Sequence, residues 1–196
     1  MPAPRLIKTK SKLIMKSIRN YFVLLSALAF AFAAQTTLAA HPPKVGDKAP
    51  RVQGPDQEGK TWKLASEIGK NVVLLYFYPK DDTPGCTKEA CGLRDRLGDL
   101  KAQGVDVIGV SFDSVDSHKS FVFKYGLNFP LIADTNGKIA DAYGARMGPD
   151  KKMARRVSFL IGLDGKIVHI TDSPNPDVHL QEMQSAIKSL NGKNSL

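Results

Sequence analysis

The sequence is poor in the residues that build metal sites and disulfide scaffolds. It contains only two cysteines, and its four histidines, His41, His118, His169 and His179, are scattered along 196 residues. A structural zinc site needs four Cys or His ligands at short spacings. Two cysteines can form only one disulfide, so a disulfide-rich secreted scaffold is excluded. These scattered residues do not make a ligand set, so we expect no metal site.

No apolar run is long enough to cross a membrane. The longest, Tyr21 to Ala34, spans 14 residues and is interrupted only by Ser26, whereas a membrane-spanning helix needs roughly 20. The first 39 residues also lack acidic side chains, carry six basic ones, and end in the small-residue site Thr37-Leu38-Ala39. These features predict a signal peptide over residues 1–39, cut after Ala39, and export to the periplasm. Met15 is an alternative start, and an uncleaved anchor is the alternative interpretation.

Little net charge remains once that segment is set aside. The whole chain has a formal charge of +9, but residues 40–196 carry 22 Lys and Arg against 19 Asp and Glu, which leaves +3. This near balance gives no reason to expect nucleic acid as a partner, or a membrane after cleavage. The 157 residues from Ala40 to Leu196 fit one domain with a sizeable core.

The periodicity of apolar residues predicts alternating strands and helices. Val72 to Tyr78 is a continuous apolar run, which is typical of a strand buried on both faces. A helix from Pro84 to about Leu100 follows, with Thr83 as a candidate N-cap. We expect an α/β domain with a mixed sheet. The further strands expected are Val105–Phe112, Pro130–Ala133, Arg156–Ile161 and Lys166–Ile170; the further helical segments are Val115–Tyr125, Ile139–Tyr143 and a C-terminal helix capped by Asn175 or Asp177. Ala40 to Lys48 is expected to be a flexible lead-in.

Cys86 lies in the first turn of the helix that is expected to follow the buried strand. A cysteine in the first helical turn faces unpaired backbone N–H groups and the positive end of the helix dipole, which stabilise a thiolate. Ionisation alone does not give an enzymic rate, so a thiol enzyme also needs groups that stabilise charge on a departing oxygen. Thr83 and a nearby arginine are candidates. The alternative is that Cys86 and Cys91 form a structural staple.

Several separated motifs resemble the peroxiredoxins. Pro79-x-x-x-Thr83-x-x-Cys86 matches their active-site pattern. The resemblance covers roughly Val45 to Leu190 and is strongest to the bacterioferritin comigratory protein and peroxiredoxin Q subgroup. The motifs that carry it are Thr83-Pro84-Gly85-Cys86-Thr87-Lys88-Glu89-Ala90-Cys91, Gly109-Val110-Ser111-x-Asp113-Ser114-Val115, Ser117-His118 and Arg156-x-Ser158-Phe159-Leu160-Ile161. It implies a thioredoxin-like fold of the peroxiredoxin type and reduction of hydrogen peroxide and organic hydroperoxides with no metal or organic cofactor. It also implies a thioredoxin-like thiol reductant and a monomer.

The resemblance also implies roles for individual residues. Cys86 would be the peroxidatic cysteine and Cys91 the resolving one, joined in a disulfide after reaction. Thr83 would bind the peroxide, Pro79 would shield the site from water, and Arg156 would stabilise the thiolate and the leaving oxygen. The chain departs from the subgroup in three places: the segment between Gly144 and Arg156 is short, Gly162 replaces an acidic residue, and Arg155 precedes Arg156. The Arg-x-Ser-Phe pattern selects Arg156, with Arg155 on the opposite face of the strand.

The spacing of the two cysteines predicts a conformational change. Five residues of helix give about 7.5 Å of rise and about 140° of rotation, whereas a disulfide needs Cα atoms within about 7 Å. The helix must therefore unwind between Gly85 and Gly92 after Cys86 becomes a sulfenic acid. Two other functions stay open: a thiol:disulfide oxidoreductase, which normally has its cysteines closer together, and a secreted binding module.

Other polar and aromatic residues are assigned structural roles. His118 lies on the apolar stripe of its helix and is predicted to pack there, and Trp62 is predicted to pack in the core. Lys80, Asp81, Asp82 and Glu89 are predicted to lie on a solvated surface.

Overall fold

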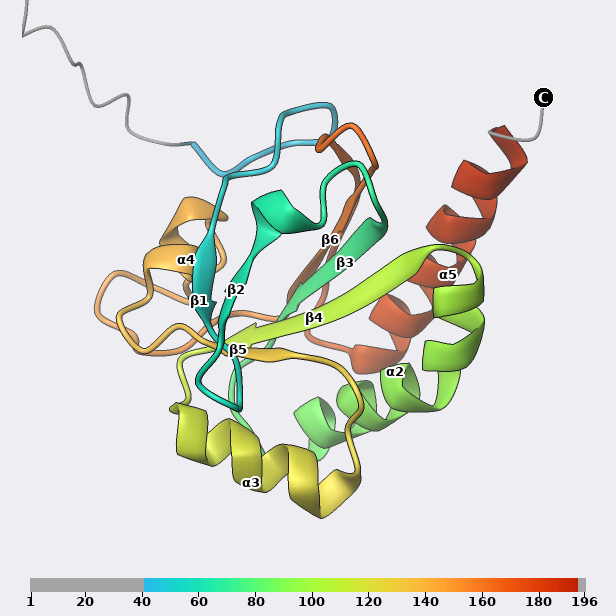
Figure 1. The fold of residues 1–196 in the computed structure, drawn as a ribbon. Coiled ribbons are helices and arrows are strands. Elements are labelled where there is room, and N and C mark those ends of the chain that lie inside the picture. Colours follow the sequence, from blue (N-terminus) through green and yellow to red (C-terminus); the bar gives the residue numbers. More distant parts are fainter. Residues whose placement is uncertain (1–40, 194–196) are drawn as a thin grey trace, which may run out of the picture. The chain divides into compact units, whose positions relative to one another are not determined.

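A five-stranded mixed sheet organises the chain. The computed structural model describes residues 41–193 (Figure 1), so the predicted signal peptide lies outside the described residues. The strands run in the order β5-β4-β3-β6-β7, with β3, β4 and β5 parallel and β6 and β7 antiparallel to their neighbours. Their bounds are β3 Val72–Phe77, β4 Val105–Ser111, β5 Leu131–Ala133, β6 Val157–Ile161 and β7 Ile167–Asp172.

Helices cover both faces of this sheet. The long helices α2 (Pro84–Ala102) and α5 (Pro176–Lys193) lie side by side on one face, together with α3 (Val115–Tyr125). The other face is covered by the short helix α4 (Lys138–Ala142), a 3-10 turn at Leu64–Ser66, and a small hairpin of β1 (Gln53–Pro55) and β2 (Thr61–Lys63). The α/β architecture expected from the sequence is confirmed; the β1–β2 hairpin was not predicted.

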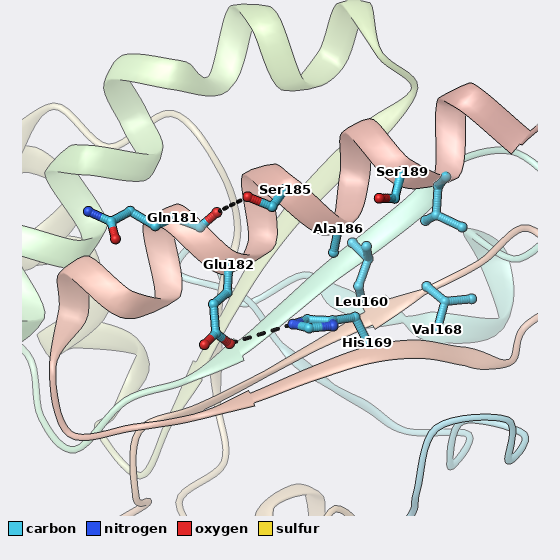
Figure 2. Close-up of a pocket in the computed structure, with 9 residues that line it drawn as sticks. Leu160, Val168, His169, Gln181, Glu182, Ser185, Ala186 and Ser189 are labelled. Carbon is cyan, nitrogen blue, oxygen red and sulfur yellow. Dashed lines mark hydrogen bonds and ion pairs between the residues drawn. The ribbon is translucent and has the colours of Figure 1, made fainter.

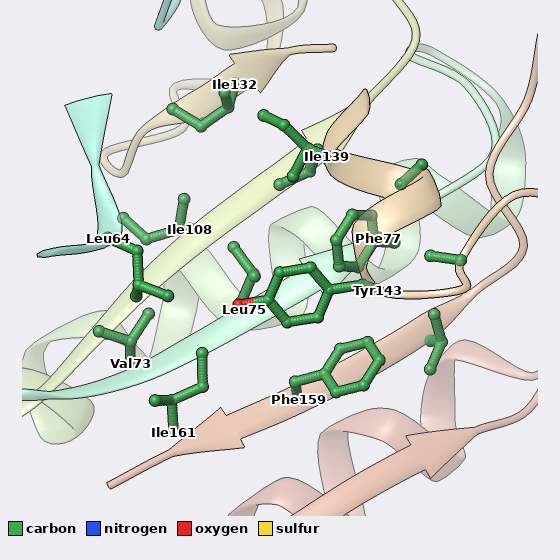
Figure 3. Close-up of a cluster of buried hydrophobic side chains, with 14 of the residues drawn as sticks. Leu64, Val73, Leu75, Phe77, Ile108, Ile132, Ile139, Tyr143, Phe159 and Ile161 are labelled. Atoms are coloured by element: carbon green, nitrogen blue, oxygen red, sulfur yellow. The ribbon is translucent and has the colours of Figure 1, made fainter. Parts of the chain in front are cut away.

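The central strand β3 supplies both hydrophobic cores. Val73, Leu75 and Phe77 point into the core beneath α4 and the hairpin (Figure 3). Trp62 belongs to the same core. Leu74 and Tyr76 point the opposite way, into the core beneath α2 and α5. Alternation along a strand sends successive side chains to opposite faces, so burial on both sides explains the continuous apolar run.

The register between β3 and β6 places the ends of two distant segments together. Phe77, the last residue of β3, pairs with Val157, the first residue of β6, in antiparallel register. The residue before Val157 therefore lies beside the carboxyl end of β3, where the chain turns toward α2. Side chains alternate along β6 as well: Ser158 and Leu160 face α2 and α5, while Phe159 faces the other core. Arg156 therefore lies on the α2 face of the sheet, at the start of α2.

The predicted flexible lead-in is wrong from Lys44 onward. Gly46 N donates to Ile167 O at 2.8 Å, and Ile167 N donates to Asp47 O at 2.9 Å. The backbone of Lys48 forms an isolated antiparallel β-bridge with Lys166. These bonds pair the lead-in with the beginning of β7, whose edge would otherwise present unpaired backbone groups. Among the described residues, no helix has the length and apolar character needed to traverse a bilayer.

Candidate active site

Cys86 is the third residue of α2, at the N-terminal end of the helix, which follows the carboxyl end of β3. Thr83 precedes the helix with extended backbone angles (φ −96°, ψ 149°), and Pro84 occupies the first helical position. No side chain caps this end. The N–H groups of the first turn therefore stay available to the Cys86 sulfur or to a bound ligand, and the helix dipole favours negative charge there.

Arg156 contacts the Cys86 sulfur directly. Its Nη2 lies 3.3 Å from Cys86 Sγ, its Nε donates to Pro174 O at 3.2 Å, and its Nη1 donates to Glu89 Oε2. Burial opposes the charge on Arg156, but Glu89 and Cys86 outweigh it and raise the pKa of the guanidinium. The arginine is thus held in place by three partners and remains charged beside the sulfur.

The sulfur lies in an enclosed site. Cys86 is only 2% exposed and belongs to the core that contains Tyr76 and Tyr78. Thr83 and Gly85 beside it are half-buried, while Pro84 is exposed. In a poorly hydrated site, fixed hydrogen-bond donors act more strongly on a developing charge than they do in water.

Glu89 is a buried carboxyl group one helical turn beyond Cys86. It is 1% exposed, and burial raises its pKa from 4.5 to about 7, against the opposing effect of Arg156. The prediction that Glu89 lies on a solvated surface is wrong. The sequence did contain a signal, because residues three apart on a helix share a face, so Glu89 had to follow Cys86 toward the core.

His179 approaches Glu89 from α5. Its Nε2 lies 2.8 Å from Ser173 O, which can only accept, so Nε2 carries the hydrogen. Its Nδ1 then accepts from Ser158 Oγ at 2.8 Å and lies 3.7 Å from Glu89 Oε1. Burial lowers the pKa of His179 and keeps the ring neutral. His179 and Ser158 were not predicted as part of the site.

Gly85 leaves room for the arginine. A Cβ atom built on Gly85 would lie 3.2 Å from Arg156 Nη2, closer than most such contacts. A side chain at this position would therefore press on the guanidinium that contacts Cys86. Glycine at this position lets the Arg156 side chain approach the backbone of α2 closely, and it is not required by an unusual backbone angle.

The remaining predicted residues lie at the same edge of the sheet. Thr83 Oγ1 donates to Lys80 O at 3.0 Å, so its lone pairs remain free to accept a hydrogen bond. Pro79 is half-buried and lies two residues after the end of β3. Both residues precede the first turn of α2, in which Cys86 lies.

Arg155 points away from this site. Its Nη1 pairs with Asp172, and its Nε donates to Gly144 O at 3.1 Å. The two ends of the short segment between Gly144 and Arg156 pair with each other. Arg146 forms an isolated antiparallel β-bridge with Ala154, and Arg155 N donates to Ala145 O at 2.8 Å. The shortened connection therefore still delivers Arg156 to Cys86.

Cys91 lies on the same uninterrupted helix. Both cysteines are free thiols, Cys86 buried and Cys91 half-buried. Five residues along an α-helix separate Cα atoms by about 8–9 Å, which exceeds disulfide reach. A bond between them therefore requires α2 to open locally, as the spacing predicted.

A separate hollow lies between α5 and β7. It has a volume of about 430 Å³, and none of the site residues around Cys86 lines it (Figure 2). Its lining comprises Leu160, Val168, His169, Gln181, Glu182, Ser185, Ala186, Ser189 and Leu190. Within residues 41–193, no group of three or more His, Cys, Asp or Glu side chains could hold a metal ion.

Comparison with known proteins agrees with this geometry. Residues 45–170 match the model of the AhpC/TSA family. The chain is 44% identical over 145 residues to the putative peroxiredoxin bcp of Coxiella burnetii, covering 71% of this chain and 95% of that protein. The structure of peroxidoxin BcpB from Mycobacterium tuberculosis superposes with a TM-score of 0.71 at 30% identity, covering 75% of this chain and 97% of that one. A structure of the Xanthomonas campestris bacterioferritin comigratory protein, described for its alkyl peroxide reduction activity, gives a TM-score of 0.66 at 29% identity, covering 71% of this chain and 92% of that one.

Proposed function

Because the chain belongs to the AhpC/TSA family, as a peroxiredoxin of the bacterioferritin comigratory protein and peroxiredoxin Q subgroup, we propose that it reduces hydroperoxides at Cys86 and resolves the product through Cys91. The observation that carries this mechanism is the 3.3 Å contact between Arg156 Nη2 and Cys86 Sγ. Alkyl hydroperoxides are included as substrates because the Xanthomonas campestris relative is described for alkyl peroxide reduction.

In the first step the Cys86 thiolate attacks one oxygen of the hydroperoxide. The S–O bond forms as the O–O bond breaks, Cys86 becomes a sulfenic acid, and the departing alkoxide or hydroxide takes a proton to leave as alcohol or water. Arg156 stabilises the thiolate and then the negative charge on the departing oxygen. Thr83 Oγ1, whose own hydrogen is donated to Lys80 O, accepts the hydrogen of the hydroperoxide, and Pro79 keeps water away.

In the second step Cys91 attacks the sulfenic acid. The first turns of α2 unwind, the S–S bond forms between Cys86 and Cys91, and the sulfenic oxygen leaves as water. The pair is intramolecular, so a monomer suffices. A thioredoxin-like dithiol then reduces the disulfide by thiol–disulfide exchange and is itself oxidised.

The location of this reaction is the cell envelope. The basic N-terminus, the short apolar run and the small residues ending at Ala39 support export and cleavage. N-terminal sequencing of protein secreted from an expressing cell, with a variant lacking residues 1–39 as control, tests this. Protein retained in the cytosol with an intact N-terminus contradicts it.

A peroxide consumption assay with a dithiol reductant tests the function itself. Cys86→Ser abolishes turnover. Cys91→Ser accumulates the sulfenic acid at Cys86, which a dimedone adduct seen by mass spectrometry reports, and oxidised wild-type protein shows a Cys86–Cys91 bridge. Undiminished turnover in Cys86→Ser would refute the peroxidase assignment, and undiminished dithiol-dependent turnover in Cys91→Ser would remove the resolving role.

A further inference from the structure

A buried polar cluster holds the loop that leads from β3 to α2. Asp81 in this loop is 7% exposed, so the prediction that it lies on a solvated surface is wrong. Its Oδ1 accepts from Tyr78 OH at 2.7 Å, its Oδ2 accepts from Ser117 Oγ at 2.7 Å, and His118 Nδ1 lies 2.9 Å from Oδ2. A carboxylate can only accept, so His118 Nδ1 carries the hydrogen.

The packing role predicted for His118 is only part of what the structure shows. His118 is 0% exposed, as expected for a residue on the apolar stripe of α3. Burying an imidazole costs free energy unless its nitrogens are bonded, and within the described part of the chain His118 Nε2 has no hydrogen-bond partner. The bond to Asp81 is therefore the feature that justifies a histidine at this position.

The backbone of the same loop is also fixed. Asp81 N donates at 2.9 Å to Oδ2 of Asp113, which lies two residues beyond the end of β4. The next residue, Asp82, has φ of +55°, in the left-handed region that non-glycine residues enter at a cost. Its carboxylate binds Lys124 Nζ at 2.6 and 2.8 Å and Tyr125 OH, both on α3. Helix α3 thus holds two successive loop residues, one by buried bonds and one by exposed bonds.

These contacts stop where α2 begins. Thr83 follows the two anchored aspartates and precedes the first helical residue, and α3 lies beside this start of α2 (Figure 1). The proposed unwinding runs the other way, from Gly85 toward Gly92. The segment that unwinds is held instead by ion pairs of Glu89 with Arg156 and of Lys88 with Asp177 of α5. The anchored loop and this segment are therefore adjacent but held by different parts of the molecule.

We propose that Asp81, bonded to Ser117 and His118 of α3, is a positioning residue that holds the Pro79–Thr83 loop in register with Cys86 for the reaction with peroxide. The cluster lies outside the Gly85 to Gly92 segment that unwinds in the proposed mechanism, so it should take no part in disulfide formation. This inference rests on the proposed function, because it assigns the cluster to one of its two chemical steps.

The two steps can be measured separately. The rate of Cys86 oxidation is followed against hydrogen peroxide concentration by stopped flow, and disulfide formation by acid quench, alkylation and mass spectrometry. Asp81→Asn should lower the second-order rate constant for peroxide about tenfold or more. It should leave the first-order rate of disulfide formation within about twofold. Ser117→Ala, which removes one donor to Asp81, should lower the rate constant for peroxide by a smaller factor and likewise leave the rate of disulfide formation unchanged.

Ser120→Ala is the matched control, because this hydroxyl lies on the same helix and donates only to Asp116 O of its own backbone. It should leave both rates unchanged. If Asp81→Asn does not fold, Ser117→Ala decides. Equal losses in both steps, or no loss in the peroxide step in folded variants, would overturn the proposal. Absence of any peroxide-dependent oxidation in the wild type would instead refute the proposed function.

Discussion

Arg156 Nη2 lies 3.3 Å from Cys86 Sγ although 70 residues separate them in the sequence. The contact arises because β6 runs antiparallel to β3, so that the residue preceding β6 reaches the edge at which α2 begins. The same guanidinium holds Glu89 and the carbonyl of Pro174. One side chain therefore ties together the reacting helix, the sheet and the start of α5.

Replacing this arginine should slow the peroxide step strongly. Arg156→Lys keeps a positive charge but loses the fork that reaches Cys86 and Glu89 at once. We expect the second-order rate constant for hydrogen peroxide to fall about 10²-fold, a typical loss for one donor to a developing oxyanion. Arg155→Gln is the control, since Arg155 pairs with Asp172 instead. A loss of equal size in Arg155→Gln would mean that the wrong arginine has been assigned.

Glu89 should make the stability of the protein depend on pH. Its pKa is about 7 in the folded protein and 4.5 as the ordinary value, so the folded state binds this proton more tightly. The stabilisation is fully present below about pH 4.5 and is lost as the pH rises through 7, by about 3 kcal/mol at most. Urea unfolding at pH 5 and pH 8 measures the change.

Glu89→Gln should remove that part of the pH dependence, because an amide does not titrate. The exposed Glu58→Gln variant should keep it. An unchanged difference between pH 5 and pH 8 in Glu89→Gln would show that another group is responsible.

Gly85→Ala should separate stability from activity. Alanine is favoured over glycine within a helix by about 0.5–1 kcal/mol, but at Gly85 its Cβ would lie 3.2 Å from Arg156 Nη2. We expect a peroxide rate several-fold lower, with a thermal midpoint unchanged or higher. Gly98→Ala on the same helix, where a Cβ meets nothing within 4 Å, should gain stability and keep full activity. A fully active Gly85→Ala enzyme would show that the arginine can yield at no cost.

The sequence predicted the layers of the domain because its strongest signals are local. The run from Val72 to Tyr78, the proline and threonine at the start of α2 and the apolar stripe of α5 each specify an element without distant information. Asn175 accepts from Asp177 N at 3.0 Å, which selects it from the two predicted caps. The β1–β2 hairpin was missed because its strands are three residues long and too short for a clear alternation.

The polar part of the site was harder to predict, since charged residues are usually exposed. Asp81 and Glu89 break that rule only because their partners, His118 and Arg156, arrive from other elements. No local pattern carries that information. The motif could place Cys86 at a helix start and choose Arg156 over Arg155, but it could not show that the carboxyl groups beside them are buried.

The antiparallel pairing of β3 with β6 makes the chemistry a property of the completed fold. An extended or partly synthesised chain carries Cys86 long before Arg156 can reach it, so its thiol is an ordinary one, slow toward peroxide. Reactivity switches on only when the last strands join the sheet. The rate at which peroxide oxidises Cys86 therefore also reports on folding and can be followed during refolding.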